Sequence, residues 1–217
     1  MINCRFSCLM IALLGAQISL ASDIEVQIQG ADGAPVSDVV VFIKQAGVAT
    51  RSLQQLEPAV MDQRDMSFVP HILVVERGTA VEFPNSDVVA HHVYSFSKPN
   101  NFVLPLYKGN QPEPIVLNHD GVVTLGCNIH DSMLGYIVVV DTDVHGLTDA
   151  EGRITLTVSD AASGYEIEIW SPRIRDKKES MRLQISELPE EVVTFNLKKS
   201  LRRAHADESE AVQWDAY

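Results

Sequence analysis

The segment from Cys127 to Met133 reads CNIHDSM, so a thiol, an imidazole and a thioether lie within seven positions. Sulfur and imidazole donors select copper or zinc over hard cations, and a weak axial Met beside His and Cys marks a blue-copper centre. Such a centre needs a second imidazole, which His91 or His92 can supply. Side chains alternate across a strand, so only one of these two neighbours can face the metal. The predicted chemistry is the transfer of single electrons.

The first 21 residues have the features of a secretory leader. One basic residue, Arg5, precedes an apolar run at positions 9–14, and small residues, Ser19 and Ala21, stand at the positions that a signal peptidase reads. The run is too short for a permanent membrane anchor. We expect cleavage near Ala21, a periplasmic mature protein and no membrane anchor.

Removal of the leader changes the meaning of the cysteine count. Cys4 and Cys8 leave with it, so the mature chain keeps a single thiol, Cys127. A lone cysteine in an oxidising compartment has no internal disulfide partner. Either Cys127 is buried and inert, or a metal ion holds it.

The charge balance is acidic, with 29 acidic and 17 basic residues and a net charge of −12. This balance argues against nucleic acid as a partner. An acidic electron carrier would be steered toward a basic patch on a redox partner. Solubility alone is an alternative explanation of the charge.

Short alternating apolar segments predict strands along the whole chain, and no long helical period interrupts them. Segments 24–28 and 39–43 flank a Gly-Ala-Asp-Gly turn and predict a hairpin. The many short strands of residues 59–142 predict a Greek-key sandwich or barrel. The fold class is therefore all-β.

Strand candidates on both sides of this block predict a second, smaller sandwich, because the early hairpin is too small to be stable alone. We expect the larger sandwich to be inserted into the smaller one. The predicted organisation is a leader (1–21), the first part of the small sandwich (22–58), the inserted sandwich (59–142), the remainder of the small sandwich (143–199) and a disordered acidic tail (200–217).

Several motifs of the predicted inserted sandwich resemble the cupredoxins, a family that includes plastocyanin, azurin and amicyanin. The short spacing from Cys127 to Met133 resembles amicyanin. The closest resemblance is to secreted plastocyanin-like proteins labelled methylamine utilisation proteins. The motifs are FVP (68–70), VVERGTAVEFPNSD (74–87), MDQ (61–63), YSFS (94–97), LPLYKG (104–109) and GCNIHD (126–131).

The resemblance implies a type 1 copper site with one copper ion per chain, whose ligands are His91, Cys127, His130 and Met133. It also implies that His130 is the ligand nearest the surface. It does not identify methylamine as an electron donor.

Cupredoxins commonly carry Asn directly after the first ligand histidine, whereas this chain has His92. His92, Asn85 and Asn128 are therefore candidates for supporting hydrogen bonds or alternative ligation. Leu106 and Leu134 are candidates for an apolar docking rim, together with Met133.

The predicted small sandwich has a more generic resemblance. Segments 32–41, 148–156 and 164–170 resemble carboxypeptidase regulatory-like or transthyretin-like domains. No catalytic grouping is found there, so we expect this part to bind a partner or to stiffen the protein.

The leading functional hypothesis is a periplasmic type 1 copper protein that passes electrons between redox partner proteins. The alternative is a copper-binding protein for delivery or buffering, with the same ligands but greater exposure. A copper enzyme would need a further histidine-lined site, and no hydrolase or nucleotide motif is present. We therefore expect neither an enzyme nor a small-molecule substrate.

Overall fold

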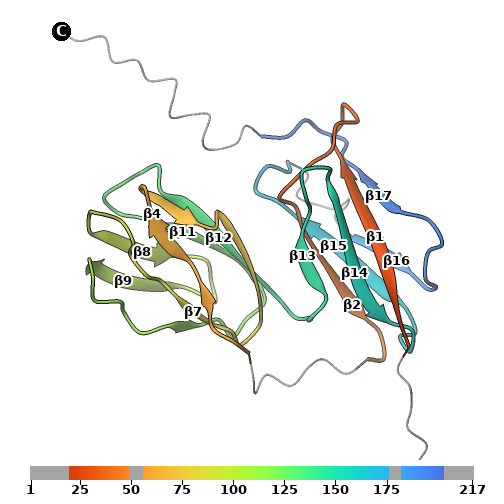
Figure 1. Cartoon of the computed structure of the whole chain (residues 1–217), viewed down its shortest axis with the longest axis horizontal. Coiled ribbons are helices and arrows are strands. Elements are labelled where there is room, and N and C mark those ends of the chain that lie inside the picture. The colour runs from red at the N-terminus through yellow and green to blue at the C-terminus, as the bar shows by residue number, and fades with distance from the viewer. Residues whose placement is uncertain (1–19, 49–55, 176–181, 203–217) are drawn as a thin grey trace, which may run out of the picture.

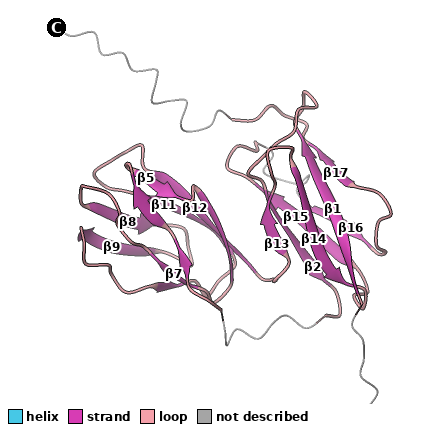
Figure 2. Ribbon diagram, viewed as in Figure 1, coloured by secondary structure: helices cyan, strands magenta, loops and turns pink. Residues whose placement is uncertain are grey.

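A computed structural model describes residues 20–48, 56–175 and 182–202. Seventeen strands and no helix form within these ranges, which confirms the predicted all-β class (Figure 2). The part of the chain so described has no helix of the length and apolarity needed to cross a membrane. Most of the predicted leader and of the predicted acidic tail lies outside the described residues.

Two sheets from the ends of the described chain face each other and form what we call the flanking sandwich (Figure 1). Their inward residues make one continuous apolar core, which includes Ile24, Val41, Ile167 and Phe195. The first sheet has the order β14 (Arg153–Ser159), β1 (Ala21–Gln29), β17 (Val193–Asn196), and the second has the order β13 (His145–Leu147), β2 (Val40–Gln45), β15 (Tyr165–Trp170), β16 (Arg182–Ile185).

The strands between β2 and β13 form a second layered unit, which we call the site sandwich (Figure 1). Its core includes Phe83, Val93, Leu125 and Ile137. The five-stranded sheet has the order β6 (Ile72–Glu76), β12 (Leu134–Val140), β11 (Gly121–Gly126), β8 (His91–Ser95), β9 (Phe102–Tyr107); the three-stranded sheet has the order β10 (Ile115–Val116), β7 (Ala80–Glu82), β3 (Ala59–Val60); and β4 (Asp62–Arg64) pairs with β5 (Ser67–Val69).

The hairpin predicted from segments 24–28 and 39–43 is wrong. Strand β1 pairs with β14 and β17, whereas β2 pairs with β13 and β15. The two strands therefore lie in opposite sheets of the flanking sandwich. The turn between them is closed by one isolated antiparallel bridge, from Gln29 to Pro35. Each of the two strands has one buried apolar face. In opposite sheets these faces pack against each other, whereas two strands paired within one sheet lie side by side and leave both apolar faces uncovered.

The two sandwiches pack against each other through a small apolar cluster. Val40 of the flanking sandwich is fully buried against Ile72, Val138 and Val140 of the site sandwich. The ring of Tyr136 also meets that of Trp170 edge to face, with centroids 5.4 Å apart. The outer face of the five-stranded sheet is therefore partly covered, whereas its inner face contributes to the core beside the site.

A tight turn before β14 requires glycine at position 152. Gly152 has a φ of +71°, and an added Cβ would lie 2.7 Å from Ile28 O and 2.8 Å from Val36 N. Because both contacts are backbone atoms, the chain itself would have to move. We expect Gly152→Ala to lower the free energy of unfolding by roughly 2–5 kcal/mol, from left-handed strain and overpacking together.

Urea unfolding followed by circular dichroism measures this effect. Gly33→Ala is the matched control, because Gly33 has a φ of +79° but nothing within 4 Å of an added Cβ. We expect the control to lose only the conformational part, about 1–2 kcal/mol. Equal losses in the two variants would contradict the steric part of the explanation.

Candidate metal centre

Two neighbouring strands of the five-stranded sheet deliver the predicted donors to one end of the site sandwich. His91 is the first residue of β8, and Cys127 directly follows the last residue of β11. The chain then forms a short loop and re-enters the sheet at Leu134, which is opposite Gly126. Within this loop the Met133 N–H donates to His130 O at 3.0 Å and closes a turn.

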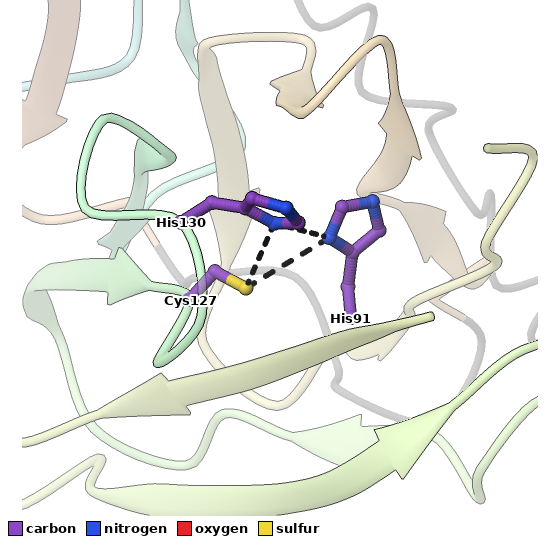
Figure 3. Close-up of side chains that lie close together, drawn as sticks. All are labelled: His91, Cys127 and His130. Atoms are coloured by element: carbon purple, nitrogen blue, oxygen red, sulfur yellow. Dashed lines mark hydrogen bonds between the residues drawn. The ribbon is translucent and has the colours of Figure 1, made fainter. Parts of the chain in front are cut away.

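Three donor atoms converge at this end, as Figure 3 shows. His91 Nδ1 and His130 Nδ1 lie 3.1 Å apart, and Cys127 Sγ lies 3.8 Å from each of them. A point inside this triangle is about 2.1 Å from all three atoms, compared with ~2.0–2.1 Å for zinc–nitrogen and ~2.3 Å for zinc–sulfur bonds. The arrangement fits a metal ion coordinated by two imidazoles and a thiolate.

The three side chains differ in how deeply they are buried. His91 is fully buried and Cys127 is 3% exposed, whereas His130 is half-buried. Strand alternation places His91 in the cluster and turns His92 to the opposite face of β8. The His92 Nδ1 atom is buried and has no hydrogen-bond partner within the described ranges.

Met133 is 2% exposed and belongs to the same apolar core as Cys127. Its position at the end of the ligand loop is compatible with an axial thioether, and this role stays a prediction. Leu134 is half-buried, whereas Leu106 is 50% exposed. Of the two rim candidates, Leu106 therefore presents more surface to a partner.

Asn85 links the segment before His91 to strand β9. Its Nδ2 donates to Val89 O and Tyr107 O, both at 3.0 Å, and its Oδ1 accepts the Asp87 N–H at 3.0 Å. Asn128, by contrast, is exposed, and its side chain makes no hydrogen bond within the described residues. Asn85 is thus the candidate whose contacts suit a supporting role.

Asp87 is a residue of the site that the sequence reasoning missed. Its Oδ2 lies 3.0 Å from His91 Nε2, and its side chain is 7% exposed. A carboxylate that accepts the Nε2–H leaves the Nδ1 lone pair free for a metal, which is how carboxylate–histidine pairs orient ligands. The available sequence signal was an acidic residue four positions before the histidine.

The Asp87 carboxylate is held in its charged form. Its pKa is lowered to about 2, first by the Met66 N–H and then by His91, with burial opposing the change. A depressed pKa contributes stability above the ordinary value of 3.8, and this contribution is lost as the pH falls through about 2. Asp87 therefore stays ionised at neutral and mildly acidic pH.

We expect Asp87→Asn to weaken metal binding by roughly 10–100-fold, because supporting carboxylates orient a ligand imidazole and raise its basicity. Competition with a chelator of known affinity measures the change. Asp131→Asn is the matched control, since Asp131 loses the same charge beside His130 but is exposed. Similar losses in both variants would point to net charge rather than to the contact with His91.

Comparison with solved structures finds cupredoxins again. The chain is similar to a reduced amicyanin variant, with 20% identity over 46% of this chain and 99% of that one (TM-score 0.35). It is also similar to a purple cupredoxin from Nitrosopumilus maritimus, with 22% identity over 38% and 99% of the two chains (TM-score 0.34). A Cu-containing nitrite reductase from Thermus scotoductus matches at 28% identity over 45% of this chain and 25% of its own (TM-score 0.37).

No protein-family model matches the chain, and no curated protein matches it. The similarities to solved structures cover less than half of the residues. The three converging donors are therefore the main evidence for the function of this chain.

Proposed function

We propose that this protein is a type 1 copper protein that carries single electrons, with His91, Cys127, His130 and Met133 as ligands of one copper ion. The observation that supports it most strongly is the triangle of two imidazole nitrogens and one thiol sulfur, with sides of 3.1, 3.8 and 3.8 Å. Soft sulfur with imidazole favours copper, and Met133, buried at the end of the same loop, is the residue that we propose as the weak axial thioether.

Copper bound there would accept and release one electron. The protein holds the ligands in place while the oxidation state of the copper changes. His91 is fixed by Asp87, and Cys127 is packed in the core. Ligands held in place by their own surroundings rearrange little between the two oxidation states, and a small rearrangement makes electron transfer fast. The buried positions of His91 and Cys127 also keep water from the donors.

His130 is the most exposed of the three converging donors, so we infer that electrons enter or leave near it. Ile129, its neighbour, and Leu106 are each 50% exposed and supply apolar surface for docking. The net charge of −12 suits a redox partner with a basic patch. Such complementarity raises association rates at low ionic strength.

The leader predicted at residues 1–21 supports a periplasmic location. Copper delivery or buffering is the alternative function and would use the same donors. Deep burial of His91 and Cys127 favours retention of the ion over its release to another protein. Within the described residues one cluster of potential metal ligands is found, and we propose electron transfer rather than catalysis.

The test is an absorption and paramagnetic resonance spectrum of the purified chain titrated with Cu(II). We expect intense visible colour that saturates at one copper ion per chain, narrow copper hyperfine splitting and reversible one-electron reduction. The zinc-loaded protein is the colourless control. A pale protein with the broad splitting of ordinary tetragonal copper would favour the buffering alternative.

A further inference from the structure

The turn that joins β4 to β5 has an unusual backbone conformation. Arg64 pairs with Ser67, so Asp65 and Met66 are its two central residues. Both have positive φ, 51° and 54°. Two-residue hairpin turns of this kind normally use Asn-Gly or a similar pair, and a bulky residue such as methionine is rare in this conformation. Strained backbone of this sort persists when surrounding structure holds it, and it is common beside functional sites.

The turn directs one backbone group at the metal centre. The Met66 N–H donates to Asp87 Oδ2 at 2.8 Å, and the same oxygen lies 3.0 Å from His91 Nε2. Met66 as a whole residue is 52% exposed. The contact with Asp87 therefore comes from the backbone of residue 66 and depends on the conformation of the turn.

Further hydrogen bonds fix the hairpin on the segment that contains Asp87. Gln63 N donates to Pro84 O at 3.1 Å, and Ser86 N donates to Gln63 O at 3.0 Å. Ser86 N also lies 3.2 Å from Asp62 Oδ1. Because these bonds tie β4 to residues 84–86, the Met66 N–H has a defined position relative to the carboxylate.

We propose that the Asp65-Met66 turn is a positioning element of the metal centre: it orients the Asp87 carboxylate, which in turn holds His91 with Nδ1 directed at Cys127 and His130. Its role in copper binding rests on the proposed function. The hairpin lies outside the five-stranded sheet that supplies the ligands, and the Met66 N–H is the group by which its turn contacts the Asp87–His91 pair. The strands of the hairpin also contact that sheet, through Gln63 Nε2, which donates to the Tyr107 hydroxyl, and through Phe68, which lies beside Gly135, so the test has to change the turn alone.

The test changes the turn and keeps the side chains of Asp87 and of the three converging donors. One variant inserts a glycine between Asp65 and Met66, and a second, Asp65→Pro, imposes a negative φ where the turn requires +51°. Nitrogen-15 NMR of the His91 ring in the metal-free protein reports its tautomer. We expect the Nε2–H form in the wild-type protein, a mixture of tautomers in both variants, and copper binding about 10-fold weaker or more.

Two controls separate positioning from general damage. Asp65→Asn combined with Met66→Gly keeps the turn and its N–H, so the tautomer and the copper affinity should match the wild type. In an Asp87→Ala background the glycine insertion should change neither the His91 tautomer nor the copper affinity any further, because the turn acts on His91 through Asp87.

An unchanged His91 tautomer in the turn variants that fold would overturn the proposal. It would also be overturned if the glycine insertion weakened copper binding as much in the Asp87→Ala background as it does in the wild-type protein. The NMR measurement needs no metal. A chain that fails to bind copper but shows the expected tautomer changes would therefore refute the proposed function and leave the positioning role supported.

Discussion

Cys127→Ser is expected to abolish the intense visible absorption of the copper-loaded protein. The colour of a blue-copper centre depends on the bond between thiolate sulfur and copper, and a serine oxygen is a hard donor that does not replace it. We expect at least a tenfold loss of visible absorbance per copper ion bound, together with broad hyperfine splitting. Absorption and paramagnetic resonance spectra of the same sample measure both changes.

The variant should remain folded. Cys127 is a small, buried member of the core, and a buried hydroxyl without a good partner costs about 1–3 kcal/mol. Met133→Leu is the control, because it removes a sulfur from the same loop and should leave the colour in place. Intense colour in Cys127→Ser would exclude the thiolate as the ligand.

Local patterns were sufficient to predict much of the site. The loop from Cys127 to Met133 carries its donors in a short stretch between two strands, so its chemistry could be inferred without knowing which strands pair. Strand alternation limited the second imidazole to one of two neighbours. The structure places His91 in the cluster and His92 on the other face of β8.

Contacts between distant segments could not be predicted in the same way. The turn at 30–33 resembles a hairpin turn, yet the partner of β1 is β14, more than a hundred residues away. An alternating apolar strand specifies which face is buried but not which strand lies beside it. The pairing is decided by how both sheets of the flanking sandwich close over their common core.

Asp87 and the turn at Asp65-Met66 were missed for a related reason. Asp-Met lacks the Asn-Gly signature of a two-residue hairpin turn, so nothing local predicts positive φ there. The contact of Met66 with Asp87 joins residues 21 positions apart and arises from the docking of β4 on residues 84–86. Side chains that support a metal site are thus less visible in a sequence than the ligands themselves.

Substitution of His91 and His92 in turn should give opposite results. His91→Ala removes a fully buried imidazole whose Nδ1 faces Cys127 and His130. Loss of a supporting contact typically weakens binding 10–100-fold, so loss of a ligand should weaken copper binding by at least about 100-fold and remove the colour. His92→Ala should change affinity only a few-fold, because its ring lies on the other face of β8.

Competition titrations and visible spectra of the two variants, compared side by side, measure the difference. They are matched controls for each other, since both remove one imidazole from adjacent positions in one strand. Equal loss of copper in both would mean that the end of β8 is disturbed as a whole and that neither ring is individually a ligand. Loss in His92→Ala alone would require β8 to present its opposite face to the metal, which would contradict the triangle formed by His91, Cys127 and His130.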